Sequence, residues 1–340
     1  MVSKRLVSLT CAALIAGAVA MVAPSAAAAA VLSGAGSTLV APIEAEWAQA
    51  WATSTGNAVP TYAAVGSGQG LKDIGSSLVD FGGSDAPISA STTPCNCLQI
   101  PWALSATGIS FNVPGVHRLH LTGSVIAKIW LGQIRNWRNS AITSLNRGTR
   151  FPNLAITPLH RSDGSGDSYA FTNYLSDVSG AWARQVGTGT KPAFPAGPGA
   201  TGNSGMVTVE GGTPGSIAYI AVSYLIAHRL PAAAIRNNAG NYEVPNLANI
   251  SNAASIVRNV PGNNELHIVN PPRSARIAYP ISTFTYCIVQ PTDPLGNGAL
   301  LKSFISYALG AGQQFGPSLD FVPLPGNIKR ADYATLSRIH

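Results

Sequence analysis

The stretch Arg161-Ser-Asp-Gly-Ser-Gly-Asp-Ser168 lies between a predicted strand, 154–159, and a predicted helix, 169–175. The same order of strand, loop of glycine and serine, and helix occurs twice earlier in the chain, around Ser37 and around Ser67. Strands that alternate with helices across short glycine turns are typical of an α/β protein. The sequence therefore predicts an α/β fold in which three loops of one kind each lead into a helix.

These three loops are candidate anion sites. The first N–H groups of a helix have no partners within the helix, and the helix dipole makes that end positive. Glycine allows the backbone to come close to a ligand, and serine and threonine hydroxyls add donors. A simpler interpretation is that the hydroxyls only cap the helices. Three such loops together with Arg161 favour a shared anion site.

Two apolar stretches, 100–113 and 281–289, bear on the domain organisation. The first is too long for a typical strand within one lobe, so we expect it to cross between lobes. A mature chain of about 310 residues also exceeds what a single core usually organises. We predict a discontinuous first lobe, 31–107 plus 282–340, and a second lobe, 108–281, inserted between its two parts.

The N-terminal segment has the features of a cleavable secretory signal over residues 1–30. Lys4 and Arg5 precede an apolar run, 6–22, and small residues follow it at once. The run is short for the roughly 20 apolar residues that a membrane span needs. Cys11 lies inside this run rather than after it. We therefore expect an exported protein without a lipid anchor, either extracellular, associated with the cell wall or periplasmic.

The balance of charged residues is weakly positive. The formal net charge of +7 falls to +5 once the two basic residues of the signal are removed. The remaining lysines and arginines are scattered along the sequence, whereas nucleic-acid binding requires a concentrated basic face. We therefore expect no nucleic-acid partner, and the modest positive charge favours the approach of a small anion.

Three cysteines remain after the signal is removed, namely Cys95, Cys97 and Cys287. An oxidising compartment favours one disulfide and one leftover thiol, and the sequence leaves open which two of them pair. A Cys-x-Cys pair without a second cluster of cysteine or histidine is a poor metal site. We expect neither a metal nor another cofactor.

Five segments of the chain together carry a resemblance to a known family. The segments are Gly34-Ala-Gly-Ser-Thr-Leu-Val-Ala-Pro42, Val65-Gly-Ser-Gly-Gln-Gly70, Val79-Asp-Phe-Gly-Gly-Ser-Asp-Ala-Pro87, Arg161-Ser-Asp-Gly-Ser-Gly-Asp-Ser168 and Tyr279-Pro-Ile-Ser282. They resemble the phosphate-binding proteins that serve as substrate-binding components of phosphate ABC transporters, the PstS family, and they occur in the family's order across nearly all of the mature chain.

The resemblance implies a two-lobed periplasmic binding protein fold, similar to type II, with the ligand in the cleft between the lobes. It also implies high-affinity binding of inorganic phosphate outside the cytoplasmic membrane and delivery to the permease subunits of an ABC transporter. We expect a monomer whose lobes close around the anion by a hinge motion.

The resemblance also assigns the ligand-binding residues, which lie on both lobes. Arg161 would contact phosphate oxygens, and Asp163 would hold its guanidinium group in place. Asp85 would accept the proton that hydrogenphosphate retains. The full set is Thr38, the amide of Leu39, Ser67 and Asp85 from the first lobe, with Arg161, Asp163, Ser165, Gly166 and the amide of Asp167 from the second.

The sequence departs from the family's pattern at two of these positions. Leu39 replaces an aromatic residue, which matters little if only its N–H binds. Asp167 replaces a threonine whose hydroxyl donates to the ligand, and a carboxylate cannot donate. An acid in the first turn of a helix favours the dipole, so we expect the Asp167 side chain to point away from the anion. The alternative is a changed protonation preference or a changed anion.

Two other classes of function remain as alternatives. A phosphatase-like enzyme has little support, because Gly82-Gly-Ser-Asp-Ala86 ends in alanine where a nucleophile elbow ends in glycine. Gly197-Pro-Gly-Ala-Thr-Gly202 matches the dinucleotide pattern by letter, but it contains proline and no strand precedes it. We therefore predict that the chain is not an enzyme. A secreted phosphate-scavenging or adhesion protein with the same fold remains the second alternative.

Overall fold

The computed structural model describes residues 30–89, 91–93 and 95–340, so nearly all of the predicted secretory signal lies outside the described residues. The strands are β1 (Ser33–Gly36), β2 (Thr61–Ala63), β3 (Phe81–Ser84), β4 (Leu98–Phe111), β5 (His120–Leu121), β6 (Thr157–Arg161), β7 (Gly199–Ala200), β8 (Ser216–Ala221), β9 (Ala234–Arg236), β10 (Tyr242–Glu243) and β11 (Ser282–Val289). The helices are α1 (Ala41–Thr55), α2 (Ser67–Gly75), α3 (Gly123–Trp130), α4 (Ser140–Thr143), α5 (Gly166–Val178), α6 (Gly180–Gln185), α7 (Gly202–Gly211), α8 (Val222–Ala227), α9 (Leu247–Ala254), α10 (Gly298–Leu309), the 3-10 helix η1 (Ala311–Leu319) and α11 (Gly326–Leu336).

A mixed sheet of eight strands runs through the molecule in the order β2-β1-β3-β11-β4-β8-β6-β7, and β10-β9-β5 form a second, smaller sheet. The α/β fold is confirmed. The long strand β4 pairs with β11 along residues 98–106 and with β8 along residues 107–111. The apolar stretch that we expected to cross between lobes therefore joins the two parts of the large sheet.

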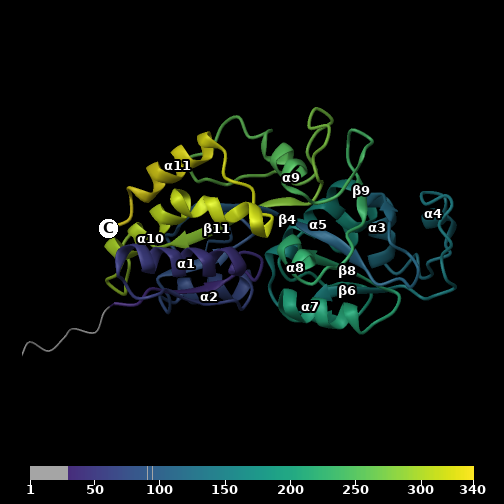
Figure 1. Ribbon diagram of the computed structural model, residues 1–340, viewed down its shortest axis with the longest axis horizontal. Coiled ribbons are helices and arrows are strands. Elements are labelled where there is room, and N and C mark those ends of the chain that lie inside the picture. The colour runs from purple at the N-terminus through teal and green to yellow at the C-terminus, as the bar shows by residue number, and fades with distance from the viewer. Residues whose placement is uncertain (1–29, 90, 94) are drawn as a thin grey trace, which may run out of the picture.

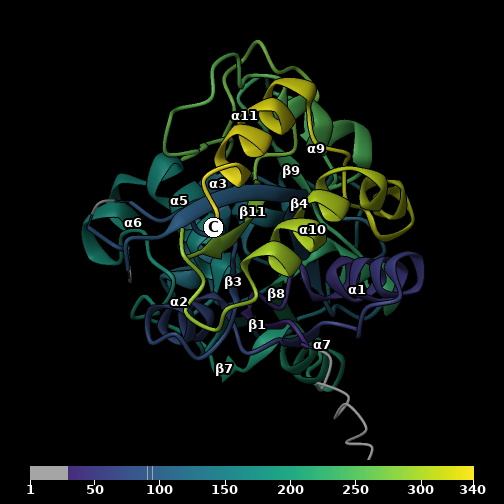
Figure 2. The ribbon, with the colours of Figure 1, turned by 90° about the vertical axis from the view of Figure 1, so that its left-hand side faces the viewer.

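Two lobes lie at opposite ends of the long axis of the molecule. Figure 1 shows the N-terminal helices α1 and α2 beside the C-terminal helices α10 and α11 at one end, and α3, α4, α7 and α8 at the other. Figure 2 faces the first end and shows α1, α10 and α11 grouped around β11. We call the end with α1 and α11 the first lobe and the end with α3 and α4 the second lobe.

Each lobe is built around buried aromatic side chains. In the first lobe the rings of Trp47 and Trp102 lie 5.2 Å apart between centroids, in contact with Phe81 and Phe304. In the second lobe Phe171 packs against Trp130 at 4.8 Å and against Tyr219 at 4.5 Å. Such pairs add to the free energy gained by burial. Trp47, Trp51, Trp130 and Trp137 are all buried and form part of the core.

The helices that follow the glycine loops begin earlier than their apolar periodicity predicts. The apolar periodicity predicts helices from 71 and from 169, whereas α2 begins at Ser67 and α5 begins at Gly166. At the first of these starts Gly66 has φ +92, a conformation that favours glycine and turns the chain directly into the helix. The loops are therefore the first turns of the helices, which brings the N–H groups of both helices into the loops.

One segment was predicted incorrectly. Residues 190–205 are rich in glycine and proline and were expected to be loop, but α7 begins at Gly202. The side chain of Asn203 in its first turn donates to Thr38 Oγ1 and accepts from the N–H of Ala221. These contacts stabilise a helix start that local composition disfavours.

The cysteines of the described residues form one disulfide and leave one thiol, as predicted. Cys95 and Cys97 form a disulfide, and Cys287 is buried without a disulfide partner within the described residues.

In the part of the chain that the structure describes, no helix is both long and apolar enough to cross a bilayer.

Candidate anion-binding site

The first part of the site is a network of hydroxyl groups around Asp85, which follows β3. The Asp85 carboxylate accepts from Ser37 Oγ at 2.6 Å and from Thr285 Oγ1 at 2.9 Å. Ser67 Oγ accepts from the N–H of Asp85 at 3.3 Å and from the N–H of Gly166 at 3.1 Å. Because Gly166 begins α5, the hydroxyl of Ser67 links the start of α2 in the first lobe to the start of α5 in the second.

The second part is centred on Arg161 at the end of β6, whose side chain is 1% exposed. Its Nε donates to Asp163 Oδ1 at 2.7 Å, and its Nη2 donates to the other oxygen of the same carboxylate. The predicted fork between Arg161 and Asp163 is therefore present. Asp163 Oδ1 also accepts from the N–H of Gly202, so α7 helps to fix this pair.

The side chain of Asp167 does not point away from the site, and our expectation of an outward orientation is wrong. Its Oδ2 accepts from Arg161 Nη1 at 3.1 Å and from Asn203 Nδ2 at 2.8 Å. Its Oδ1 accepts from Thr107 Oγ1 at 2.7 Å. Three donors from β4, β6 and α7 outweigh the preference of the helix dipole, and the carboxylate is buried beside the arginine.

The remaining predicted residues lie at the starts of helices or in the few residues before them. The N–H of Leu39 donates to Ser37 Oγ at 3.0 Å, and Thr38 Oγ1 accepts from Asn203 Nδ2 at 2.8 Å across the lobes. Ser165 Oγ accepts from the N–H of Ser168 at 3.3 Å, which is the geometry of a helix cap. Ser67, in contrast, makes no cap bond to α2.

The lobes touch directly around this cluster. The N–H of Gly68 donates to the carbonyl of Gly164 at 2.9 Å. Asp85, Arg161 and Asp167 are each at most 3% exposed. The nine predicted residues are thus brought together in one enclosed region between the lobes, with Thr38, Leu39, Ser67 and Asp85 on one side and Arg161, Asp163, Ser165, Gly166 and Asp167 on the other.

The cluster contains more acidic than basic groups. Burial, together with the charge of Asp167, raises the pKa of Asp85 to about 7, although hydrogen bonds from Ser37 and Thr285 oppose the shift. Burial also raises the pKa of Asp167 against the opposing charge of Arg161. Burial would raise the pKa of Asp163 too, but its hydrogen bonds with Arg161 outweigh that effect and lower it. One arginine therefore faces one firmly ionised carboxylate and two that hold protons more readily than usual.

Four polar residues of this cluster were not predicted to be part of the site. Ser37 lies within one of the five segments that carry the resemblance, but the resemblance assigns its neighbour Thr38 to the ligand. Thr107 and Thr285 lie in apolar strands, where threonine is an ordinary strand residue and gives no signal of its own. Asn203 lay in the segment expected to be loop. The full set is Ser37, Thr107, Asn203 and Thr285.

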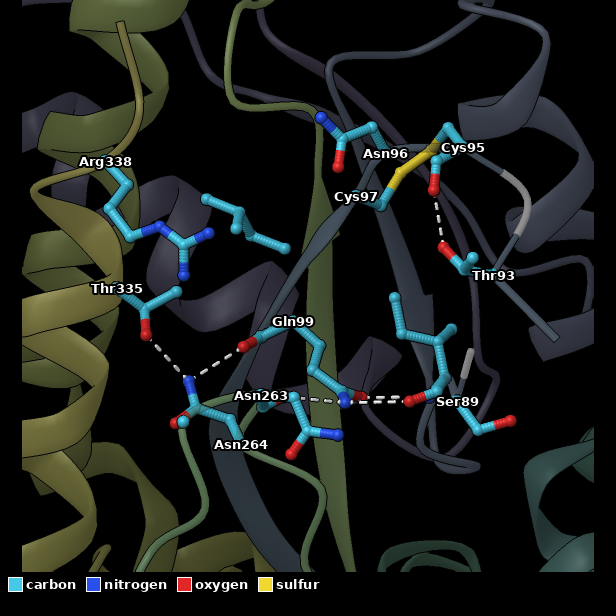
Figure 3. Close-up of a pocket in the computed structure, with 13 residues that line it drawn as sticks. Ser89, Thr93, Cys95, Asn96, Cys97, Gln99, Asn263, Asn264, Thr335 and Arg338 are labelled. Carbon is cyan, nitrogen blue, oxygen red and sulfur yellow. Dashed lines mark hydrogen bonds between the residues drawn. A yellow bond between two sulfur atoms is a disulfide. The ribbon is translucent and has the colours of Figure 1, made fainter. Parts of the chain in front are cut away.

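A separate hollow of about 440 Å³ lies in the first lobe beside the Cys95–Cys97 disulfide. Figure 3 shows that its amide side chains bond within the protein: Gln99 Nε2 donates to two carbonyls, and Asn264 Nδ2 donates to Thr335 Oγ1. Its lining includes one charged side chain, that of Arg338. This hollow lacks the concentration of donors and charges that marks the cluster between the lobes.

Two lobes that enclose an arginine, backbone N–H groups and hydroxyls define a binding protein for a small oxyanion. The PBP superfamily domain matches residues 22–311. Phosphate-binding protein PstS of Xylella fastidiosa (strain 9a5c) is 33% identical over 304 residues, which cover 87% of this chain and 82% of that protein. PstS of Pasteurella multocida (strain Pm70) is 32% identical and covers 87% of each chain. The chain belongs to the PstS family of phosphate-binding proteins.

Solved structures agree with this fold. A high-affinity periplasmic phosphate-binding protein (PfluDING) bound with phosphate superposes with a TM-score of 0.71 at 20% identity, over 90% of this chain and 93% of that one. The phosphate-binding protein from Stenotrophomonas maltophilia gives a TM-score of 0.69 at 20% identity, over 90% of this chain and 93% of that one. The two-lobed periplasmic binding protein fold is therefore confirmed.

Proposed function

We propose that this protein binds inorganic phosphate outside the cytoplasmic membrane and delivers it to the permease subunits of an ABC transporter. The observation that carries the proposal is the buried Arg161, held by Asp163 beside the N-termini of α2 and α5. A charged arginine fork and helix N–H groups are the donors that suit phosphate oxygens. The family of the chain supports the same ligand.

The division into lobes supports capture by hinge closure. We assign 31–107 plus 282–340 to the first lobe and 108–281 to the second. Pairing of β11 with β3 and β4 supports the return of the chain to the first lobe. Because β4 and the segment before β11 connect the lobes, a change in their dihedral angles would separate the Ser67 and Gly166 sides of the site.

The predicted ligand-binding residues of both lobes can donate hydrogen bonds to one anion. The N–H groups of Gly166 and Asp167 lie at the start of α5, and that of Leu39 lies just before α1. Hydroxyl groups are supplied by Thr38 and Ser165, which precede Leu39 and Gly166 in the chain, and by Ser67, which accepts from the N–H of Gly166. In the closed protein several of these groups bond to one another. Phosphate would replace those internal bonds with bonds to its oxygens, so the site is already arranged for an anion with many acceptors.

The protonation state of the anion affects how it can bind in this cluster. Asp85 and Asp167 lie in a region with one arginine, so an anion with no proton would face an excess of negative charge. Hydrogenphosphate can donate its proton to the Asp85 carboxylate, which accepts further bonds from Ser37 and Thr285. We infer a preference for protonated forms of phosphate.

Binding without turnover is the outcome expected for the mature protein. Equilibrium dialysis with labelled phosphate should give one bound phosphate per chain. Incubation with a chromogenic phosphate ester should release no product, because the relatives of this chain are phosphate-binding proteins. Ester turnover at a rate that falls when Arg161 is replaced would contradict the binding function and favour an enzyme.

Closure is tested by adding a methyl group where the lobes meet. A Cβ at Gly166 would lie 2.8 Å from Asp85 Cα, closer than real Cβ contacts. Gly166→Ala should hold the lobes apart and weaken phosphate binding by at least about tenfold, which is 1.4 kcal/mol. Gly211→Ala is the matched control, since a Cβ there meets nothing within 4 Å. Equal affinities for the two variants, measured by calorimetry, would argue against closure at this contact.

Removing the charge of Asp167 tests its unexpected position. The Asp167 carboxylate accepts a hydrogen bond from Arg161 Nη1, a donor that a bound anion would otherwise use. Asp167→Asn should therefore increase phosphate affinity by at least about tenfold at the higher pH values, where the carboxylate is ionised. The gain should shrink as the pH is lowered, because the raised pKa of Asp167 lets the wild type take up a proton sooner than an ordinary aspartate would. A loss of affinity at the higher pH would show that the carboxylate assists binding.

A further inference from the structure

The second lobe carries a long stretch of chain without acidic residues. No aspartate or glutamate occurs between Asp85 and Asp163. Six basic residues in this interval are exposed, and we call them the basic tip: Arg118, Lys128, Arg135, Arg138, Arg147 and Arg150. With the signal removed the chain carries +5, so the rest of the mature chain has a formal net charge of −1. The basic tip therefore holds the whole positive excess of the protein.

Hydrogen bonds bring these separated residues together in the fold. Asn146 exchanges bonds with the backbone of His120 at 2.7 and 2.9 Å, which places the chain near Arg118 beside the chain near Arg147. The N–H of Trp137 donates to the carbonyl of Leu154 at 3.0 Å.

Hydrogen bonds made by Arg135 and Arg138 bring further segments of the basic tip together. The carbonyl of Arg135 accepts from the N–H of Ile156 at 2.9 Å, and Arg138 Nε donates to the carbonyl of Phe151, the neighbour of Arg150, at 3.0 Å. Figure 1 shows the surrounding elements α3 and α4 at the end of the long axis far from the C-terminus. The five arginines are scattered along the sequence, but the fold brings their segments together at this end of the molecule.

The tip is not neutralised within the protein. The ion pairs found among the described residues involve Arg161 and His267, and none involves a residue of the basic tip. No large hydrophobic side chain of residues 113–160 is exposed. A partner would therefore contact the tip through its charge and not through inserted apolar groups. Five of the six residues are arginines, whose planar forks suit phosphate oxygens.

We propose that the basic tip docks on the anionic phospholipid headgroups of the membrane that carries the transporter. Clusters of four to eight basic residues bind such surfaces by electrostatic attraction alone. Such docking would keep the protein near the membrane. That purpose rests on the proposed delivery function, but the binding itself needs neither phosphate nor a permease.

Cosedimentation of the mature protein with vesicles tests the proposal. Vesicles of phosphatidylglycerol mixed with phosphatidylcholine should bind the protein at about 0.05 M salt, and vesicles of phosphatidylcholine alone should not. Reversing Arg118, Arg147 and Arg150 to glutamate should weaken this binding by at least about a hundredfold, since each basic residue near the surface contributes about fivefold. The side chains of these three make no hydrogen bond among the described residues, so the variant should keep its fold and its phosphate affinity.

A second triple variant is the matched control. Reversing Arg258, Arg330 and Arg338 to glutamate changes the net charge equally, but these exposed arginines lie on or beside α11, at the end of the molecule away from the basic tip. This control should keep vesicle binding within about threefold of the wild type, because charges beyond about one Debye length are screened. Equal losses in both variants, no binding to the anionic vesicles, or binding only to soluble polyphosphate chains would each overturn the proposal. Phosphate titration of the same samples reports separately on the anion site.

Discussion

Arg161→Ala is expected to abolish most of the phosphate binding of this protein and to lower its stability. Arg161 supplies the one full positive charge within the enclosed cluster, and a charge-linked hydrogen bond contributes about 1.5–3 kcal/mol. Its removal would also leave Asp163 and Asp167 buried without their partner. Breaking a buried ion pair costs about 3–5 kcal/mol, which should appear in the free energy of unfolding in denaturant.

Two further variants make this result specific. Arg161→Lys should restore stability better than affinity, because a lysine keeps the charge but loses the fork that meets both Asp163 oxygens. Arg184→Ala removes an exposed arginine from the same lobe and should leave both quantities unchanged. An Arg161→Ala variant with wild-type phosphate affinity would place the anion site elsewhere.

Rejection of sulfate is the second large effect that we expect. An ionised Asp85 accepts a hydrogen bond from the protonated oxygen of hydrogenphosphate, whereas sulfate has no proton to donate and would set its oxygens against the carboxylate. Sites built around such a hydrogen bond discriminate by about 10⁴ to 10⁵ against analogues that leave it unmade. Asp85→Asn should reduce this discrimination more than it reduces phosphate affinity, because an amide can donate to sulfate.

The pH dependence of sulfate rejection follows from the raised pKa of Asp85. With a pKa of about 7, Asp85 is ionised in alkaline solution and protonated in acid. A protonated Asp85 can donate to sulfate, so discrimination should fall as the pH is lowered from about 8.5 to about 5.5. The Asp85→Asn variant should lack this trend. Asp177→Asn removes an exposed carboxylate and serves as the control, with wild-type selectivity at each pH.

Much of the fold and most of the cluster could be predicted from the sequence, because glycine loops before helices are local signals. Ser67 and Gly166 lie where such loops predict them, at the first residues of α2 and α5. The helices themselves were predicted to start too late, because glycine and serine in the loops interrupt the apolar periodicity. The positive φ of Gly66 lets the chain turn directly into α2 despite that interruption.

The direction of the Asp167 side chain could not be predicted in this way. The rule for an acid in the first turn of a helix concerns the dipole, which is a local effect worth a fraction of the free energy of three hydrogen bonds. The donors that fix the carboxylate are Thr107, Arg161 and Asn203, which come from separate segments of the chain. The basic tip was missed for the same reason, because tertiary contacts such as Asn146 with His120 gather residues that the sequence keeps apart.

Calorimetric titration of the mature protein with phosphate and with sulfate is the most direct test of phosphate-specific binding by this cluster. At about pH 8, phosphate should bind with a stoichiometry of one, and sulfate at the same concentrations should give no heat of binding. Repeating the phosphate titration in buffers of different ionisation enthalpy should reveal proton uptake, as expected where an anion joins carboxylates with raised pKa values. Equal, strong binding of sulfate, or no binding of phosphate, would contradict the assignment of this site.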